Sequence, residues 1–238
     1  MKGFNLKLIV HILGLLLLFN SIFLAITTLF SYLQNDGITN GLLKALAINV
    51  IFGGLALGLT LNHRKEIKKR EGYIIVAFGW LTMVVFGMFP YLFTNVITSC
   101  TDAFFETMSG YTATGATILD DIEALPRSML LWRSLTHWMG GMGIIVLAIA
   151  ILPLLGIGGM QLFSAEAPVL GGDKLHPRIS DTAKRLWLIY VGLTLTNAIL
   201  LFASGMPLFD AINHAMSTMA SGGFSTKNAS IGYWNHMP

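Results

Sequence analysis

The sequence predicts an all-α membrane protein, built from transmembrane helices and two shorter segments that enter the membrane and return. Of its 238 residues, 54% are apolar and only 11% are charged, whereas soluble domains carry about 25% charged residues. Long uncharged runs recur along the chain, and two of the segments between them are rich in Gly, Ser and Thr. With one cysteine, Cys100, this composition excludes a disordered chain, a nucleic-acid-binding domain and a secreted disulfide scaffold.

Five uncharged runs have the roughly 20 apolar residues that a helix needs to cross a bilayer. The predicted spans are Leu8–Leu33, Ala45–His63, Gly72–Thr101, Ser134–Ala165 and Leu186–Phe209. The first run follows two lysines, as a signal peptide would. However, it exceeds the 7–15 residues of a signal-peptide core, and no A-x-A-like cleavage site follows it. We therefore interpret it as a retained transmembrane anchor.

The basic residues predict the orientation of the chain. Three segments hold 11 of the 15 lysines and arginines, and all three fall on one side if the five spans alternate in direction. These residues are Lys2, Lys7, Arg64, Lys65, Lys68, Lys69, Arg70, Lys174, Arg178, Lys184 and Arg185. Because positive residues favour the cytoplasmic side, the N-terminus is predicted inside and the segment after Leu208 outside. The segment His63–Glu71 also suits contact with anionic lipids.

Two outer-side segments, Asn95–Pro126 and Met206–Pro238, do not have the sequence of plain polar loops. Each contains a stretch with apolar residues at helical spacing, followed by a stretch of small residues. The expected helices are Thr101–Met108 and Phe209–Met216, and the small-residue stretches are Ser109–Thr117 and Ser217–Thr226. A helix of about 12 residues is only about 18 Å long. Each unit is therefore predicted to enter the membrane and return as extended backbone.

The two units resemble each other at a spacing of 108 residues. The matching pairs are Asp102 and Asp210, Ala103 and Ala211, Met108 and Met216, Ser109 and Ser217, and Gly115 and Gly223. Repeated units arranged around an axis are a common way to build a central pathway through a membrane. Irregular backbone at membrane depth is tolerated only where protein buries it or where it lines a water-filled cavity. The repeat therefore predicts two strands that line one pathway.

The small-residue stretches have the chemistry that a dehydrated alkali cation requires. Such an ion needs several oxygen ligands, and backbone carbonyls supply them where the side chains are small. Residues 112–117 and 220–226 fit this need, and Gly115 can adopt backbone angles closed to other residues. The partially negative C-terminal ends of the short helices also favour a nearby cation. The alternative interpretation of each stretch is a Thr- and Gly-rich outer turn.

Four segments together resemble the N-terminal half of the TrkH-type potassium transporters of the Trk/Ktr/HKT superfamily. They are DAFFETMSGYTATGATIL (102–119), WRSLTHWMGGMGIIVLAIAILP (132–153), GGMQLFSAEAP (158–168) and DAINHAMSTMASGGFSTKNAS (210–230). The resemblance implies two leading helices followed by four membrane–pore–membrane repeats, each with one filter strand centred on glycine. The residues whose carbonyls would coordinate potassium are then Ala113, Thr114, Gly115, Ser221, Gly222 and Gly223.

The resemblance also implies an organisation and partners. Two leading helices and a basic cytoplasmic loop would occupy residues 1–71, the first repeat 72–165, a cytoplasmic connection 166–185, and the second repeat 186–238. The expected function is potassium uptake across a bacterial inner membrane, in a homodimer with a cytoplasmic nucleotide-binding regulatory subunit. Potassium is the only cofactor expected. The resemblance implies no nucleic-acid partner. Because the family uses four filter strands and this chain has two, we interpret the sequence as a fragment or truncated product that stops at Pro238, after the second strand.

Arg133 and His137 lie four residues apart at the start of the fourth predicted span, on one helix face. The resemblance suggests that Arg133 orders the periphery of the pore by pairing with Glu106 or Asp102. The alternative is an arginine that extends its charged end to the membrane surface. His137 occupies a position where a glutamine is more usual in the family.

Further patterns predict structural roles or a metal site. Asp102 with Glu106, and Asp210 with His214, have spacings that suit a transition metal, but their separation on two repeats makes this interpretation weak. Small residues on two helix faces predict close helix packing. These are Gly53, Gly54, Gly58, Gly140, Gly141 and Gly143. The five tryptophans, at 80, 132, 138, 187 and 234, mostly suit an interfacial belt.

Three classes of function are compatible with the sequence. A potassium transport subunit accounts for the repeated helix and glycine units. A membrane-embedded enzyme would use His137, His214 or Asp210 in acid–base chemistry. The sequence contains no nucleophile elbow, no HExxH metal motif and no paired intramembrane aspartates, and we assign no catalytic residue. The third class is a non-conducting remnant or assembly subunit.

Overall fold

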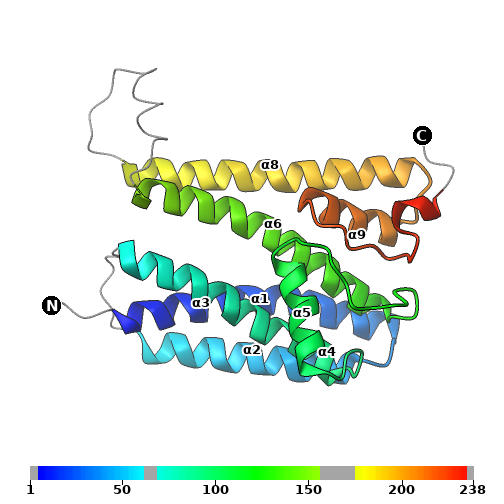
Figure 1. Ribbon diagram of the computed structural model, residues 1–238, viewed down its shortest axis with the longest axis horizontal. Coiled ribbons are helices and arrows are strands. Elements are labelled where there is room, and N and C mark those ends of the chain that lie inside the picture. Colours follow the sequence, from blue (N-terminus) through cyan, green and yellow to red (C-terminus); the bar gives the residue numbers. More distant parts are fainter. Residues whose placement is uncertain (1–4, 62–68, 156–174, 235–238) are drawn as a thin grey trace, which may run out of the picture.

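The computed structural model describes residues 5–61, 69–155 and 175–234, and within these residues it is helical, with no strand (Figure 1). This confirms the predicted all-α class. The longer helices are α1 (Leu6–Gln34), α2 (Thr39–Leu59), α3 (Lys69–Gly87), α6 (Arg127–Leu155) and α8 (Leu175–Ala203). The shorter ones are α4 (Phe89–Phe93), α5 (Cys100–Tyr111), α9 (Leu208–Met219) and a 3₁₀ turn, η1 (Ser230–Tyr233). Residues 166–174 of the predicted connection 166–185 lie outside the described residues, as do the basic residues at 64–68 and 174, whereas residues 175–185 form the start of α8.

Four segments of the described chain are long and apolar enough to cross a membrane: Leu6–Gln34, Thr39–Leu59, Glu71–Phe93 and Lys184–Ala203. The protein is therefore a multi-pass membrane protein. The helix α6 covers part of the remaining predicted span, and its 29 residues correspond to about 43 Å at 1.5 Å per residue. Its N-terminal half carries several buried polar side chains, among them Arg133 and His137.

The third predicted span, Gly72–Thr101, was wrong as a single helix. The helix α3 ends at Gly87, α4 begins at Phe89 with Pro90 in its first turn, and a loop separates α4 from α5. Proline lacks the N–H that would continue the preceding hydrogen-bond ladder, so a helix commonly restarts there. Asn95 then adopts a left-handed conformation, with φ of 56°, which ends α4. Because none of these residues is charged, charge-free length alone could not reveal the break.

The helices α1 and α2 form a close hairpin through small residues. A Cβ added to Gly14 would lie 2.8 Å from the Cβ of Ala56, and one added to Gly53 would lie 2.9 Å from Leu18. This confirms the packing role predicted for Gly53. For Gly54 and Gly58 an added Cβ would have no neighbour within 4 Å among the described residues, so their packing role stays a prediction.

The hydrophobic core lies between α1, α3, α5 and α6. Fully buried members include Leu24, Val84, Ala103 and Trp132. The indole nitrogen of Trp132 donates a hydrogen bond to the Gly87 carbonyl at 3.2 Å. The predicted interfacial role was therefore wrong for this tryptophan, because its only polar group is satisfied inside the protein.

The helix ends that flank the three basic segments lie at the same end of the molecule. Figure 1 places the start of α1, the end of α2, the start of α3, the end of α6 and the start of α8 together at its left. The short helix α9 lies toward the opposite end. This arrangement is the one that alternating spans require, and it puts the second small-residue stretch at the end of the molecule away from these helix ends.

Candidate functional site

The two short helices α5 and α9 repeat each other closely. Each has 12 residues, and the bounds Cys100–Tyr111 and Leu208–Met219 differ by 108 positions at both ends. Each carries an aspartate in its first turn, Asp102 or Asp210. Both helices are about one turn longer than the sequence predicted, because the three residues after Met108 and the three after Met216 continue the helix. The repeat found in the sequence is therefore also a repeat of secondary structure.

The backbone after each helix follows the same course. The first residue beyond the C-cap is left-handed in both units, with φ of 53° at Ala113 and 56° at Ser221. The next amide, of Thr114 or Gly222, donates back to the helix at 3.0 or 2.9 Å. Two residues after the left-handed position, the glycine has a positive φ, 76° at Gly115 and 139° at Gly223. Each stretch thus begins with a left-handed turn, whereas the sequence predicted extended backbone. The turn forms because it provides hydrogen-bond donors for the carbonyls at the helix end.

The structure brings the two glycine positions side by side. A Cβ added to Gly115 would lie 2.7 Å from the carbonyl oxygen of Gly222 and 3.3 Å from the Cα of Gly223. No side chain fits at Gly115 without moving the second unit. Ala113, Thr114 and Ser221 form the turns that lead from the helix ends to this contact.

The helix α6 packs behind both units through small residues. A Cβ added to Gly140 would overlap the Tyr111 carbonyl at the end of α5, and one added to Gly141 would lie 2.8 Å from the Cα of Ala220, at the end of α9. A Cβ at Gly143 would lie 3.4 Å from Trp80. The packing role predicted for these three glycines is confirmed. Because α6 touches both helix ends, it sets the position of each glycine stretch.

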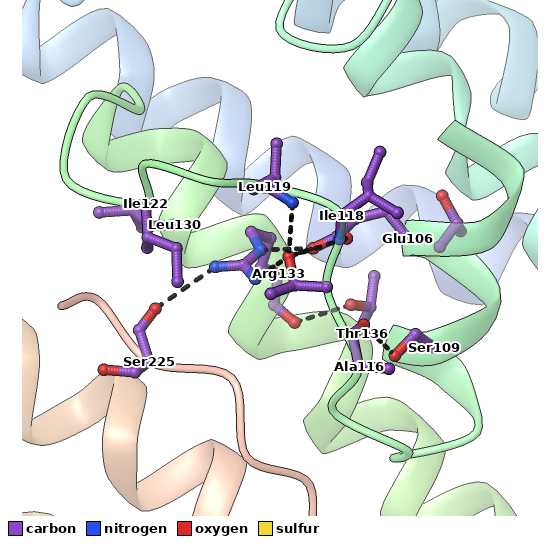
Figure 2. Close-up of polar contacts among 12 residues, drawn as sticks. Glu106, Ser109, Ala116, Ile118, Leu119, Ile122, Leu130, Arg133, Thr136 and Ser225 are labelled. Atoms are coloured by element: carbon purple, nitrogen blue, oxygen red, sulfur yellow. Dashed lines mark hydrogen bonds and ion pairs between the residues drawn. The ribbon is translucent and has the colours of Figure 1, made fainter. Parts of the chain in front are cut away.

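Arg133 and Glu106 form a buried ion pair beside the first unit (Figure 2). Their side chains are 1% and 0% exposed, and the Arg133 Nε lies 2.9 Å from Glu106 Oε1. Glu106 also accepts hydrogen bonds from the Thr117 hydroxyl at 3.0 Å and from the Ile118 amide at 3.1 Å. Arg133 therefore does not extend to the membrane surface. The pair ties α6 to the backbone that follows Gly115.

The same guanidinium reaches the second unit. Arg133 Nη1 donates to the Ser225 carbonyl at 3.3 Å, and its Nη2 donates to the Thr117 hydroxyl at 3.2 Å. The guanidinium carbon also lies 4.1 Å from the centre of the Phe224 ring, a cation–π distance. Figure 2 shows the guanidinium between the two units. One arginine thus braces the chain beyond both glycines. Its other predicted partner, Asp102, is exposed.

The second unit has a neutral counterpart of the Glu106 cluster. His214 aligns with Glu106, and its Nε2 lies 3.0 Å from the Ser225 hydroxyl, which aligns with Thr117. The Thr226 hydroxyl donates to Asp210 at 2.6 Å. Both units therefore use a side chain of the short helix to hold a hydroxyl residue 11 positions later. Within the described residues, no group of three His, Cys, Asp or Glu side chains could hold a metal ion, so the weak transition-metal interpretation finds no support there.

A third buried network links the leading hairpin to the first unit. The Tyr111 hydroxyl, at the last residue of α5, donates to Asn20 in α1 at 2.7 Å. Asn20 donates to Asn49 in α2 at 3.0 Å, and Asn49 donates to the Phe86 carbonyl at 3.3 Å. All three side chains are buried. Polar groups that are costly to bury alone satisfy each other here, and they join α1, α2 and α3 to the helix that precedes Gly115.

The outer loops of the two units also meet. Asn228 donates to Asp121 at 2.9 Å, and the Lys227 ammonium lies 2.9 Å from Glu123. The hydrogen bond from Asn228 lowers the pKa of Asp121 below its ordinary value, and the hydrogen bond from Lys227 does the same for Glu123. The Glu123 carboxylate in turn raises the pKa of Lys227. This outer clasp (Asp121, Glu123, Lys227 and Asn228) connects the segments that follow the two glycines.

Several side chains of the site escaped the sequence analysis. Thr117, Ser225 and Phe224 contact Arg133 or His214, and Tyr111 anchors α5 to the leading hairpin. The 108-residue spacing carried a usable signal, because Thr117 and Ser225 are aligned hydroxyl residues. Tyr111 aligns with Met219 and therefore left no such signal.

The fold and site together describe a membrane protein with two repeated short helices, each followed by a glycine stretch. A family profile described as TrkH, "Cation transport protein", matches residues 39–238. The chain belongs to this family, which is a family of transporters and not of enzymes. It is 46% identical over 233 residues to the Trk system potassium uptake protein TrkH of Halomonas elongata, and 44% identical over 231 residues to that of Escherichia coli K12.

The fold agrees with a solved transporter. The crystal structure of the potassium transporter TrkH from Vibrio parahaemolyticus matches with a TM-score of 0.85 and 40% sequence identity. The alignment covers 97% of this chain and 46% of that one. For the Halomonas and Escherichia proteins the shares are 97% and 96% of this chain and 48% of each relative. The chain thus spans about half the length of the relatives that it matches.

Proposed function

We propose that this chain contributes half of a potassium pathway across a bacterial inner membrane, with its N-terminus in the cytoplasm. The observation that carries the proposal is the contact between Gly115 and Gly222–Gly223, which places two repeated glycine stretches against one another. The proposed ligands are the backbone carbonyls of Ala113, Thr114, Gly115, Ser221, Gly222 and Gly223. Carbonyl oxygens can replace the water around a potassium ion without the charge that would trap it.

The electrostatics of the short helices support a cation at this place. Each glycine stretch directly follows the C-terminal end of α5 or α9, where the helix dipole is partially negative. In the proposed arrangement Arg133 and Glu106 lie at the periphery of the pore. Since they form an ion pair, they brace the strands without adding net charge to the ion path.

A complete ring of ligands requires further strands beside these two. We propose that the remaining strands come from two more repeats, as the resemblance to the family implies, and that the domain boundaries given above apply. The family resemblance also supports a homodimer that works with a cytoplasmic nucleotide-binding regulatory subunit. The relatives are named as proteins of the Trk potassium uptake system, which agrees with this proposal.

Potassium uptake by cells tests the assignment of the filter. The full-length gene product containing residues 1–238 is expressed in a strain that lacks potassium uptake systems, and growth and rubidium uptake are measured at low potassium. Gly115→Ala and Gly223→Ala are each expected to lose uptake or potassium-over-sodium selectivity, because both φ values are positive and a Cβ at 115 meets the opposite strand. Gly54→Ala is the matched control, since no atom of the described residues lies within 4 Å of its added Cβ. Unchanged selectivity in both filter variants would overturn the assignment.

A second candidate function is that of an assembly subunit that does not conduct alone. It is favoured by the presence of two glycine stretches within a chain that covers 48% of its relatives. Purified residues 1–238 in potassium-loaded liposomes distinguish the two. Selective potassium flux would support a conducting chain, whereas flux that appears only when the remaining repeats are added would support the assembly role.

A further inference from the structure

His137 is buried directly behind the second glycine stretch. It lies on α6 one turn after Arg133, and its side chain is fully buried. Its ring stacks on Phe224 with centroids 3.9 Å apart and planes 9° from parallel. Its Nδ1 lies 3.0 Å from the Ser217 hydroxyl. The hydrogen bond between Arg133 and Glu106 does not involve this ring, so the ion pair does not explain why a histidine is buried here.

The imidazole fills the space that a side chain at Gly222 would need. A Cβ added to Gly222 would overlap His137 Nδ1 and lie 2.9 Å from its Cγ. The histidine ring and the second stretch are therefore in direct contact, and Gly222 can only be glycine while His137 is present. A residue that contacts a proposed ligand strand this closely is placed to control the direction of its carbonyls.

The hydrogen bonds around the ring meet at the Ser217 hydroxyl. The Gly223 amide can only donate, and it donates to the Ser217 hydroxyl oxygen at 3.1 Å. Donation of the Ser217 hydrogen to His137 Nδ1 requires an unprotonated Nδ1, with the ring hydrogen on Nε2. Among the described residues, His137 Nε2 has no hydrogen-bond partner.

This chain of hydrogen bonds sets the orientation of one peptide group. The N–H and C=O of a trans peptide point in opposite directions, and the described residues contain no cis peptide. Because the Gly223 N–H is held toward Ser217, the Gly222 carbonyl is directed away from α9. Its oxygen is the atom nearest to the Cβ position of Gly115, at 2.7 Å. We propose that His137 is a positioning residue, which through Ser217 aims the Gly222 carbonyl at the ion path.

The first unit holds its strand differently. Ser109 aligns with Ser217, but its hydroxyl donates to the Ala116 carbonyl at 2.5 Å. The two serines therefore fix different peptide groups, and only the second unit relies on an imidazole. The proposal rests on the proposed function, because it assumes that the Gly222 carbonyl is an ion ligand, and it adds a selectivity role for a side chain outside the strands.

Uptake selectivity tests the proposal in the full-length gene product. His137→Leu and Ser217→Ala are each expected to lower potassium-over-sodium selectivity about five- to tenfold, the range expected from one neutral hydrogen bond. The double variant is expected to lose no more than either single variant, since both break one chain. His137→Asn is expected to restore selectivity to within about twofold, because its side-chain oxygen can accept from Ser217 as Nδ1 does. His11→Leu, a histidine change in α1, is the control and is expected to leave selectivity unchanged.

The amount of each variant in the membrane is measured by immunoblot, so that a folding loss is separated from a selectivity loss. Wild-type selectivity in His137→Leu and Ser217→Ala, together with loss in Gly223→Ala, would overturn the positioning role and leave the filter assignment standing. Wild-type behaviour of the Gly115 and Gly223 variants would instead overturn the proposed function.

A measurement without transport tests the hydrogen-bond chain itself. Nitrogen-15 NMR of histidine-labelled protein in bilayers reports which ring nitrogen is protonated, and the signal missing in His137→Asn identifies the residue. The expected result is a neutral ring with its hydrogen on Nε2 and a hydrogen-bonded Nδ1, and a shift of the Nδ1 signal in Ser217→Ala. A hydrogen on Nδ1, or no response to Ser217→Ala, would contradict the proposal even if the protein did not conduct.

Discussion

The two short helices and their glycine stretches are alike in backbone and different in the side chains that hold them. Their bounds and left-handed positions match at a spacing of 108 residues. The first unit is braced by a buried charge pair, Arg133 with Glu106, and the second by a neutral histidine, His214, bonded to Ser225. A repeated backbone can therefore be kept in position by different chemistry, provided that each buried polar group finds a partner.

The difference also shows where asymmetry enters the proposed pathway. The first unit is tied to the leading hairpin through Tyr111 and Asn20, whereas the aligned residue of the second unit, Met219, has no hydroxyl to offer. In the second unit, Ser217 and Phe224 contact the His137 ring.

Removing one member of the charge pair should have the largest effect. Arg133→Leu leaves Glu106 without its charge partner in a buried site, and the loss of one partner of a buried pair costs about 3–5 kcal/mol. The expected outcome is little folded protein in the membrane. The double variant Arg133→Leu with Glu106→Gln should recover part of the folded amount, because no unpaired charge remains. Equal loss in the single and double variants would show that shape at these positions, and not charge pairing, stabilises the first unit.

A carboxylate introduced at the equivalent position of the second unit should destabilise the protein almost as much. His214→Glu places a carboxylate at the position equivalent to Glu106, where Ser225 is the hydroxyl partner and Arg133 reaches only the Ser225 backbone. An unpaired buried carboxylate is costly, so the thermal unfolding temperature in detergent is expected to fall clearly. His214→Gln, which keeps a polar group without the charge, is the control and is expected to fall less. A His214→Glu variant as stable as wild type would show that the two units are interchangeable.

A smaller effect is expected from the link to the leading hairpin. Tyr111→Phe removes the hydroxyl that donates to Asn20, and one hydrogen bond contributes about 1 kcal/mol. The measurement is again the thermal unfolding temperature, with Met219→Leu at the aligned position of the second unit as the control. The prediction is a decrease only for Tyr111→Phe. Equal stability of both variants would remove the hairpin link as a feature that distinguishes the two units.

The outer clasp should show the smallest effect, and one that depends on pH. Because the pKa values of Asp121 and Glu123 are lowered in the folded protein, their contribution is present above the ordinary values of 3.8 and 4.5. It is lost as the pH falls through the lower, folded values. Lys227, whose pKa is raised, loses its contribution only when the pH rises above its ordinary 10.5. Hydrogen exchange of residues 225–230 is expected to be slower at pH 7 than under acid conditions after correction for intrinsic rates.

Glu123→Gln offers the control for the clasp. It should reduce the pH dependence of protection in this segment while leaving the hydrogen exchange of α5 unchanged. Protection that is the same above and below the carboxyl pKa values would show that the clasp does not hold the outer loops together.

Much of the fold was predictable because low charge and apolar length report on the membrane directly. The break at Pro90 and Asn95 was missed, since those residues interrupt a run without adding charge. In the site, the repeat located both short helices, because glycine and aspartate recur at the same spacing. The partners of Arg133 and His137 could not all be predicted, since Phe224, Ser225 and Ser217 lie 80 to 92 residues away in the chain and only packing brings them together.

The central claim is that the two glycine stretches form adjacent parts of one ion site. The most direct measurement is a crystal structure of the full-length gene product with rubidium in place of potassium, using the anomalous signal of rubidium to locate the ion. We expect rubidium density bordered by carbonyl oxygens of both the Ala113–Gly115 and the Ser221–Gly223 stretches, and we expect this density to be lost in Gly115→Ala. Density elsewhere in the protein, with none between these stretches, would contradict it.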